Sequence, residues 1–462
     1  MRQKIINDII HGNIELSDFE FQLLKNPIVN RLHQILQNSV AYTVYPNMKA
    51  SRFEHSLGTL NYAGKMYKYG LINSSLSKAY LENKHNWIKE TLQNKIPEIS
   101  EIAKKCGFTT IVLKNLLKKK YSINEDFTNI GILLDDPKFT NKVKKFIGSS
   151  FLDRNANNQN SNLESVNILL FQSVRLFGLT HDIGHLPLSH LFEFSIENLY
   201  EHLVDSLINL ESKREELSNS FKYRDGLNDL LEDKDQIHEV VGKNITRIIF
   251  NEELDNSCKD KTVSDKEERF LNSVIVLLLK EIWVEIIKGK KGHFYSLYSI
   301  VSSTIDCDRL DYVQRDGLMS GIAKHTGNPD RIIEMFCLGK NPNTDAKYLD
   351  NYLFMPSIQS LDSVEEMLHN RYRIYRFVIN HHAVVRANFI MQKVIENKLI
   401  NEIDALNKKD EYSLVPNSLK EVIDMAIDIS SSSSEKQPDE IISTYIQLTD
   451  FWLFSTLNKD FT

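Results

Sequence analysis

Apolar residues recur every three or four positions along most of the chain, which is the spacing of one face of an α-helix. The longest such pattern runs from Val166 to about Leu399, with a charged interruption near Asn251 to Lys266. Glycine is scarce, at 17 residues, and this favours helices over a sandwich or a barrel. The pattern predicts a mainly all-α fold, with minor short β-strands near the N-terminus and in the C-terminal half.

Local signals mark one helix start and two exposed loops. Ser51 is the expected N-cap of a helix, and Glu54, three residues later, would complete a capping box. The polar stretch Asp153 to Asn162 predicts an exposed loop, and the serine run Ser430 to Ser434 predicts a flexible one. Between Glu82 and Gly148 the chain is rich in lysine with interleaved apolar residues, which indicates a helical insert.

Composition limits the class of protein. The apolar fraction of 42% is ample for a core, and the net charge of -6 argues against a protein that coats nucleic acid. The four cysteines are widely separated without a C-x-x-C pair, so we interpret them as reduced thiols. Because the chain has neither a signal-peptide pattern nor a long apolar run, we expect a cytoplasmic protein without a membrane span.

The segment Leu179 to His190 contains the densest cluster of candidate ligands. On a helix, His181 and His185 would share a face, with Asp182 beside the first of them. Neutral imidazole nitrogens and carboxylate oxygens together suit a divalent metal of borderline hardness. The alternative is a helix whose histidines make ordinary hydrogen bonds in a core.

The neighbouring motifs favour the metal site, because His55 precedes this segment and Asp308 follows it in the order H…HD…D. The chain thereby resembles the dNTP triphosphohydrolases of the HD superfamily, which include the bacterial dGTPases. The resemblance implies an HD-domain helical core. The matching segments are Ile5 to Gly12, Arg31 to Gln37, Arg52 to Gly58, His181 to Glu193, Ile305 to Asp316 and Leu368 to His382.

The resemblance implies a division of the chain and a set of metal ligands. The four regions are the N-terminal part of the core with the first histidine (1–80), the lysine-rich insert (81–165), the catalytic core (166–400) and a C-terminal helical region (401–462). The cofactor would be one divalent transition metal (Mn, Fe, Ni, Co or Zn), with Mg accompanying the triphosphate. Its ligands would be His55, His181, Asp182 and Asp308, the last preferred over Asp306 because a basic residue follows it.

Matching positions also imply roles in catalysis and substrate binding. The candidates for proton delivery, or for orienting its donor, are His185, His190, Glu193 and His238. Arginine forks would take the phosphate oxygens, two residues would hold the 3′-hydroxyl, and a tyrosine would pack on the sugar. The predicted substrate-binding residues are Gln37, Arg52, Arg309, Tyr312, Asp316, Arg371 and Tyr375. At position 379 this chain has isoleucine, where the mammalian enzyme of the family has a second sugar-contacting tyrosine.

The resemblance therefore implies an enzyme that splits a dNTP at the α-phosphorus into deoxynucleoside and inorganic triphosphate. One alternative is an HD phosphohydrolase acting on another nucleotide or on a single-stranded DNA phosphoester. A catalytically silent dNTP sensor is the other. Relatives assemble as oligomers, so we expect a homo-oligomer, from dimer to hexamer. Nucleic acid binding through the lysine-rich insert is open but not favoured.

Overall fold

The structure, a computed structural model, describes most of the chain. The polar stretch predicted as a loop is helical at its start, because α8 (Ser149–Asn155) extends into it, and the rest lies outside the described residues. Of the serine run, Ser430 ends a helix and the other residues are not described. The described ranges are 4–155, 163–208, 210–231, 236–322, 329–342, 349–407, 418–430 and 438–458.

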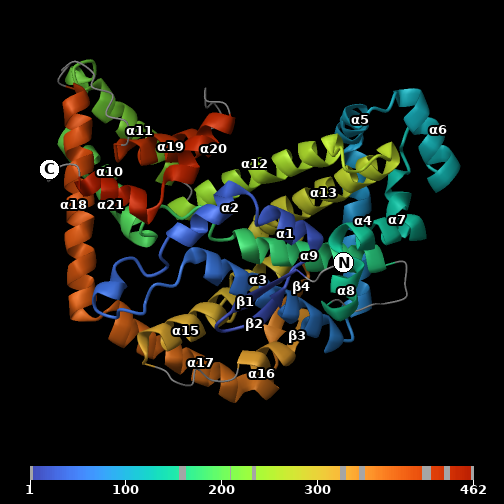
Figure 1. The fold of residues 1–462 in the computed structure, drawn as a ribbon, viewed down its shortest axis with the longest axis horizontal. Coiled ribbons are helices and arrows are strands. Elements are labelled where there is room, and N and C mark those ends of the chain that lie inside the picture. The colour runs from blue at the N-terminus through green and yellow to red at the C-terminus, as the bar shows by residue number, and fades with distance from the viewer. Residues whose placement is uncertain are drawn as a thin grey trace.

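The fold is mainly helical, as predicted, with two small antiparallel sheets. Near the N-terminus, β1 (Ile5–Asp8) pairs with β2 (Gly12–Glu15). In the C-terminal half, β3 (Phe336–Lys340) pairs with β4 (Tyr352–Pro356). Both sheets appear near the middle of the molecule in the view of Figure 1.

Three helices form the centre of the molecule. Helix α3 (Arg52–Ile72) packs against α9 (Glu164–Thr180) and α15 (Cys307–Ser320). Ser51 caps α3 and forms the predicted capping box with Glu54. In α9, every residue from Ser165 onward is buried, including polar residues such as Gln172 and Arg175, which donate hydrogen bonds to Glu20. A Cβ at Gly178 would lie 3.1 Å from the backbone nitrogen of Leu60, so the lack of a side chain lets α9 approach α3 closely.

Two long helices connect the two sides of the molecule (Figure 1). They are α12 (Ile237–Lys259) and α13 (Lys266–Ile286), which pack on each other. At one end they meet the insert, and at the other α12 contacts α19 (Lys420–Ser430). Helix α13 also packs against α9, so the buried core is continuous from the centre into the insert.

The lysine-rich insert is helical, as predicted. Its lysines form ion pairs with acidic residues of the body, including Lys105 with Asp255 and Lys120 with Glu267. Each exposed pair contributes little on its own, so the buried apolar faces carry most of the stability. The proposed boundaries of the four regions fall inside helices, and the division into domains stays a prediction. The insert consists of α4 (Ser77–Asn94), α5 (Ile96–Lys105), α6 (Thr110–Tyr121), η3 (Ile130–Asp135), α7 (Pro137–Ile147) and α8.

The remaining elements surround the centre. Within the part of the chain that the structure describes, each helix is too short or too polar to cross a lipid bilayer. These elements are α1 (Asp18–Leu23), α2 (Pro27–Arg31), η1 (Leu32–Gln34), η2 (Ala41–Thr43), α10 (His190–Leu207), η4 (Glu211–Lys213), α11 (Ser218–Leu231), η5 (Gly289–Lys291), α14 (Tyr295–Val301), α16 (Pro329–Glu334), η6 (Ile358–Ser360), α17 (Leu361–Ile374), η7 (Tyr375–Ile379), α18 (His382–Asn407), α20 (Pro438–Gln447) and α21 (Asp450–Asn458).

The close approach of α3 and α9 predicts a sensitive position. Leu60→Ala removes a fully buried side chain at this contact, and we expect the free energy of unfolding to fall by about 2–5 kcal/mol. Urea denaturation followed by circular dichroism measures the change. Leu318→Ala, at an exposed position of α15, is the control and should change stability far less. Equal losses in the two variants would contradict the assignment of the core.

Candidate functional site

The structure brings the four predicted metal ligands together where α3, α9 and α15 meet. His55 Nε2 lies 3.0 Å from Asp308 Oδ1 and 3.6 Å from Asp182 Oδ2. His181 Nε2 lies 3.4 Å from Asp182 Oδ1 and 3.9 Å from Asp308 Oδ1. Four donors from three separate segments therefore converge on one point, and their role as metal ligands stays a prediction.

Both imidazole rings are oriented by their far nitrogens. His55 Nδ1 lies 2.7 Å from Asp311 Oδ2, and His181 Nδ1 lies 2.8 Å from the carbonyl oxygen of Gly178. An acceptor at Nδ1 places the proton there and leaves the Nε2 lone pair for a cation. The Nε2 atoms of His55 and His181 are buried without a hydrogen-bond partner among the described residues. These orphaned nitrogens, together with two carboxylates, fit a divalent metal ion.

The charges of the site support the same interpretation. Burial raises the pKa of Asp182, but Arg52 and the neighbouring histidines hold it well below its usual range. Burial also raises the pKa of Asp308, but the hydrogen bond and charge of His55 lower it more, so the net shift is downward. For His55, burial lowers the pKa, yet Asp308 and Asp311 raise it to about 10. The two carboxylates thus stay ionised and require a positive charge between them, from either a proton or a cation.

Asp306, the rejected alternative to Asp308, has a structural task. Its carboxylate caps α15 by accepting hydrogen bonds from the backbone N–H groups of Arg309 (2.8 Å) and Ser303 (2.7 Å). Burial and the neighbouring Asp308 raise the pKa of Asp306 to about 7. Asp306 therefore fixes the start of α15, and the adjacent turn carries Asp308.

The prediction that His181 and His185 lie on one helical face is wrong. Helix α9 ends at Thr180, and residues 181–184 form turns. The chain then passes through two left-handed non-glycine residues, Leu188 (φ 58°) and Ser189 (φ 54°), before α10 begins at His190. Backbone conformations of this kind are costly and concentrate at functional sites. These two residues precede His190 directly, and His190 lies with His185 in a second cluster beside the four ligands.

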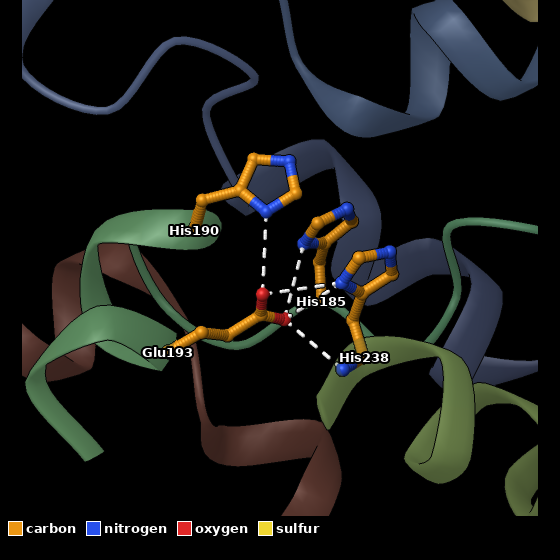
Figure 2. A group of neighbouring side chains, drawn as sticks. All are labelled: His185, His190, Glu193 and His238. Carbon is orange, nitrogen blue, oxygen red and sulfur yellow. Dashed lines mark hydrogen bonds and ion pairs between the residues drawn. The ribbon is translucent and has the colours of Figure 1, made fainter. Parts of the chain in front are cut away.

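That cluster contains the four predicted catalytic residues, and Figure 2 shows three imidazoles around the carboxylate of Glu193. His238 Nδ1 lies 2.9 Å from Glu193 Oε1, and His190 Nδ1 lies 3.2 Å from Oε2. His185 stacks on His238 with ring centroids 4.0 Å apart. Each ring turns one nitrogen toward Glu193 and the other away from it (Figure 2).

Electrostatics distinguish the stacked rings. Burial lowers the pKa of His238, but Glu193 raises it more, so the net shift is upward. Burial, Arg52 and His238 together hold the pKa of His185 well below its usual range. Burial raises the pKa of Glu193, yet the histidines bring it well below its usual range. His238 is therefore the proton-carrying ring of the stacked pair, and Glu193 is its ionised partner.

A glycine holds the two clusters close together. A Cβ on Gly184 would overlap the carbonyl oxygen of His238 and the backbone nitrogen of Gly242. Only glycine lets the turn after α9 lie directly on the first turns of α12. His185 also bridges the clusters, since its Nε2 lies 3.3 Å from Asp182 Oδ1.

Both clusters open into one cavity of about 1260 Å³. His55 and Glu193 lie beneath its wall, while the other predicted ligands and catalytic histidines line it. The seven predicted substrate-binding residues also line this cavity: Gln37, Arg52, Arg309, Tyr312, Asp316, Arg371 and Tyr375.

The predicted phosphate-binding arginines make contacts within the protein. Arg52 donates to Asp182, and Arg309 donates to Asp306. Arg371 donates from Nε to the Tyr312 hydroxyl (2.7 Å), and its guanidinium lies 4.8 Å from the Tyr375 ring centroid. These pairs hold cationic groups at the cavity wall.

Two predicted sugar-contacting residues are buried beside the arginines. Gln37 Oε1 has no hydrogen-bond partner among the described residues. Asp316 accepts from the Asn38 amide at 2.8 Å, and burial raises the pKa of Asp316 to about 6.

Several cavity residues were not predicted from the sequence. The wall also includes Trp283 of α13, Phe389 of α18 and a basic group near η5. The short run Lys288 to Gly292 could have indicated the basic group, since two glycines flank a pair of lysines there. The basic residues are Lys243, Lys288, Lys290 and Lys291.

Comparison with known proteins gives modest but consistent similarity. No family model matches the chain. An HD domain-containing protein of Acanthamoeba polyphaga mimivirus is 25% identical over 263 residues, which are 56% of this chain and 45% of that protein. The deoxynucleoside triphosphate triphosphohydrolase SAMHD1 homolog of Dictyostelium discoideum is 21% identical over 424 residues, 90% of this chain and 52% of that protein. Human deoxynucleoside triphosphate triphosphohydrolase SAMHD1 is 44% identical over 61 residues, 13% of this chain and 10% of that protein.

The chain spans about half the length of the mimivirus and Dictyostelium relatives. The resemblance to HD-superfamily proteins that the motifs predict is confirmed. The metal-ligand, catalytic and substrate-binding roles of single residues stay predictions.

The orphaned nitrogens predict a measurable effect of metal. Added Mn²⁺ should raise the thermal midpoint of the protein, because a ligand at 100 times its Kd stabilises the folded state by about 2.7 kcal/mol. Differential scanning fluorimetry of metal-stripped protein measures the shift. His181→Ala and Asp182→Asn should lose it, whereas His202→Ala, at an exposed position, should keep it. Equal shifts in all four proteins would rule out this site.

Proposed function

We propose that this protein is a metal-dependent dNTP triphosphohydrolase that releases deoxynucleoside and inorganic triphosphate. The observation that carries the proposal is one cavity that brings the proposed metal ligands His181, Asp182 and Asp308 together with His238 and three arginines, with His55 and Glu193 just beneath its wall. Relatives named as deoxynucleoside triphosphate triphosphohydrolases support the substrate class. A charged wall beside proton-transfer groups is the arrangement that phosphoester hydrolysis requires.

The metal would be held by His55, His181, Asp182 and Asp308, and Mn, Fe, Co, Ni or Zn would suit this donor set. When bound, a divalent cation supplies Lewis-acid stabilisation of charge on the phosphate oxygens and acidifies water. Mg would accompany the triphosphate as its counterion. The proton that the attacking water gives up would pass through the cavity to bulk solvent.

The leaving group needs a proton from the protein. As the water oxygen forms its bond to the α-phosphorus, the bond from phosphorus to O5′ breaks and its electron pair stays on O5′. His238, protonated and held by Glu193, would donate to this oxygen, and His185 would orient it by stacking. His190 contacts the other oxygen of Glu193 and would restrain the carboxylate. The deoxynucleoside then leaves neutral.

Cationic groups would receive the triphosphate. Arg52, Arg309 and Arg371 line the same cavity, and the guanidinium fork suits two oxygens at once. Lys288, Lys290 and Lys291 extend the positive wall from the η5 turn. The arginines are already held near carboxylates or tyrosines, so little conformational freedom is lost when phosphate binds.

The sugar site would exclude a 2′-hydroxyl. Gln37 Oε1, buried without a partner among the described residues, is an acceptor for the 3′-hydroxyl, and Asp316 lies in the same wall. Tyr312, fixed by Arg371, would pack against C2′ and leave no room for an extra oxygen. A homo-oligomer in the cytoplasm remains our expectation.

Product analysis tests the proposal. Metal-replete protein incubated with each dNTP should release deoxynucleoside and inorganic triphosphate in equal amounts, measured by anion-exchange chromatography. Asp182→Ala should abolish this turnover, because it removes a proposed metal ligand.

Other outcomes would overturn the proposal in different ways. Hydrolysis of a monophosphate, a cyclic nucleotide or a single-stranded DNA end, with dNTPs left intact, would identify an HD phosphohydrolase of another specificity. Binding of dNTP without turnover in either protein would identify a sensor.

Sugar selection gives a second test. Tyr312→Ala opens the space beside C2′, so the ratio of kcat/KM for dNTP over rNTP should fall about tenfold or more, in line with steric discrimination of about 1–3 kcal/mol. Tyr312→Phe keeps the ring and should keep the ratio. If both variants keep it, Tyr312 does not select the sugar.

A further inference from the structure

Asp311 lies directly behind the metal site and is fully buried. Its Oδ2 accepts from His55 Nδ1 (2.7 Å) and from Arg315 Nε (2.9 Å). Its Oδ1 accepts from His11 Nε2 (2.6 Å) and from Arg315 Nη2 (2.8 Å). Four donors from three segments therefore use the two oxygens of one carboxylate.

The direction of these hydrogen bonds is fixed by their partners. The side-chain amide of Asn61 donates to His11 Nδ1 at 3.2 Å, so His11 carries its proton on Nε2 and donates to Asp311. Arg315 donates to both oxygens of Asp311, as a guanidinium does to a carboxylate. His55 must therefore present its Nδ1 proton to this acceptor.

A glycine makes room for this arrangement. Gly58 lies in α3 one turn after His55, and a Cβ there would overlap both Asp311 Oδ1 and His11 Nε2. Helices disfavour glycine by about 1 kcal/mol relative to alanine. The close packing of carboxylate and imidazole against the helix backbone accounts for glycine at this position.

The N-terminal hairpin completes the network. Asp8, the last residue of β1, accepts from Arg315 Nη1 at 2.9 Å, and its other oxygen accepts from the backbone N–H of His11 at 2.9 Å. Arg315 is itself fully buried between the two carboxylates. Asp8 and Arg315 therefore hold Asp311 and His11 in place.

We propose that Asp311 is a positioning residue that fixes the tautomer and orientation of His55, and that His11 of the N-terminal hairpin and Arg315 of α15 hold Asp311 for this task. The inference rests on the proposed metal site. A carboxylate that accepts from the far nitrogen of a ligating histidine also makes that histidine a stronger ligand, and loss of such partners typically costs about 10–100-fold in metal affinity. The N-terminal hairpin would then support the metal site through Asp311 without supplying a ligand of its own.

Asp311→Asn is the decisive variant. Whichever way the amide is turned, its NH₂ group faces two donors, from Arg315 and from one of the two histidines. We expect the Kd for Mn²⁺, measured by calorimetry on metal-stripped protein, to rise about 10–100-fold. Gly58→Ala should raise the same Kd, because its methyl group displaces the carboxylate without removing it.

Matched controls separate positioning from general loss of stability. Glu20 is also fully buried, and its oxygens accept from Arg175 Nε (2.7 Å) and Nη2 (2.8 Å), away from the metal site. Glu20→Gln should lower the thermal midpoint and leave the Kd for Mn²⁺ unchanged. Gly64→Ala, in the same helix, pushes on the Arg175 side chain instead of Asp311 and should also leave the Kd unchanged.

The outcomes distinguish the two proposals. If wild-type protein does not bind Mn²⁺, the metal site itself is refuted. If wild-type binds and Asp311→Asn binds equally tightly, the positioning role is refuted while the metal site stands. An unchanged Kd in a folded Gly58→Ala protein would equally overturn the role of Asp311. A rise of the same size in Glu20→Gln would show that general destabilisation, and not the Asp311 contact, sets the affinity.

Discussion

Ionised carboxylates inside an apolar helical core must have positive charge within reach, and this requirement determines the centre of the molecule. An unpaired buried charge costs several kcal/mol, so each such group needs a partner. Arg315 lies beside Asp311, Arg52 beside Asp182, and His238 beside Glu193. Among the described residues, the ion-pair partners of Asp308 are the imidazoles of His55 and His181, so Asp308 is the carboxylate whose charge a metal would best balance.

The pairing of these buried charges also requires that backbone segments approach one another closely. Gly58 lets His11 and Asp311 lie against α3, and Gly184 lets the turn after α9 touch α12. A methyl group at Gly58 would overlap the Asp311 carboxylate, and one at Gly184 would overlap backbone atoms of α12. The proposed ligands and the proposed proton donor are therefore linked through backbone packing as well as through His185, which contacts Asp182 on one side and His238 on the other.

The sequence revealed the parts of the site that form local motifs. The order of His55, the His181–Asp182 pair and Asp308 carries a family resemblance, and this resemblance predicted that the residues meet although they lie in three segments far apart in the sequence. The end of α9 at Thr180 was missed, since the left-handed Leu188 and Ser189 are not residues that sequence rules place there. The Asp311 network was missed because His11 and Asp311 are 300 positions apart and meet only through packing around Gly58.

The insert shows why a long stretch of chain between two site residues, here His55 and His181, leaves the site intact. It joins the end of α3 to the start of α9, and its helices pack back on this pair through α8 on α3 and α7 on α9. Closing a loop costs only about 0.6 kcal/mol more for each doubling of its length. The ion pairs of Lys105 and Lys120 with the α12–α13 side of the body add further anchoring outside the core. Because the added residues bury their own apolar faces, the contact between α3 and α9 is preserved, and with it the geometry that sets His55 opposite His181.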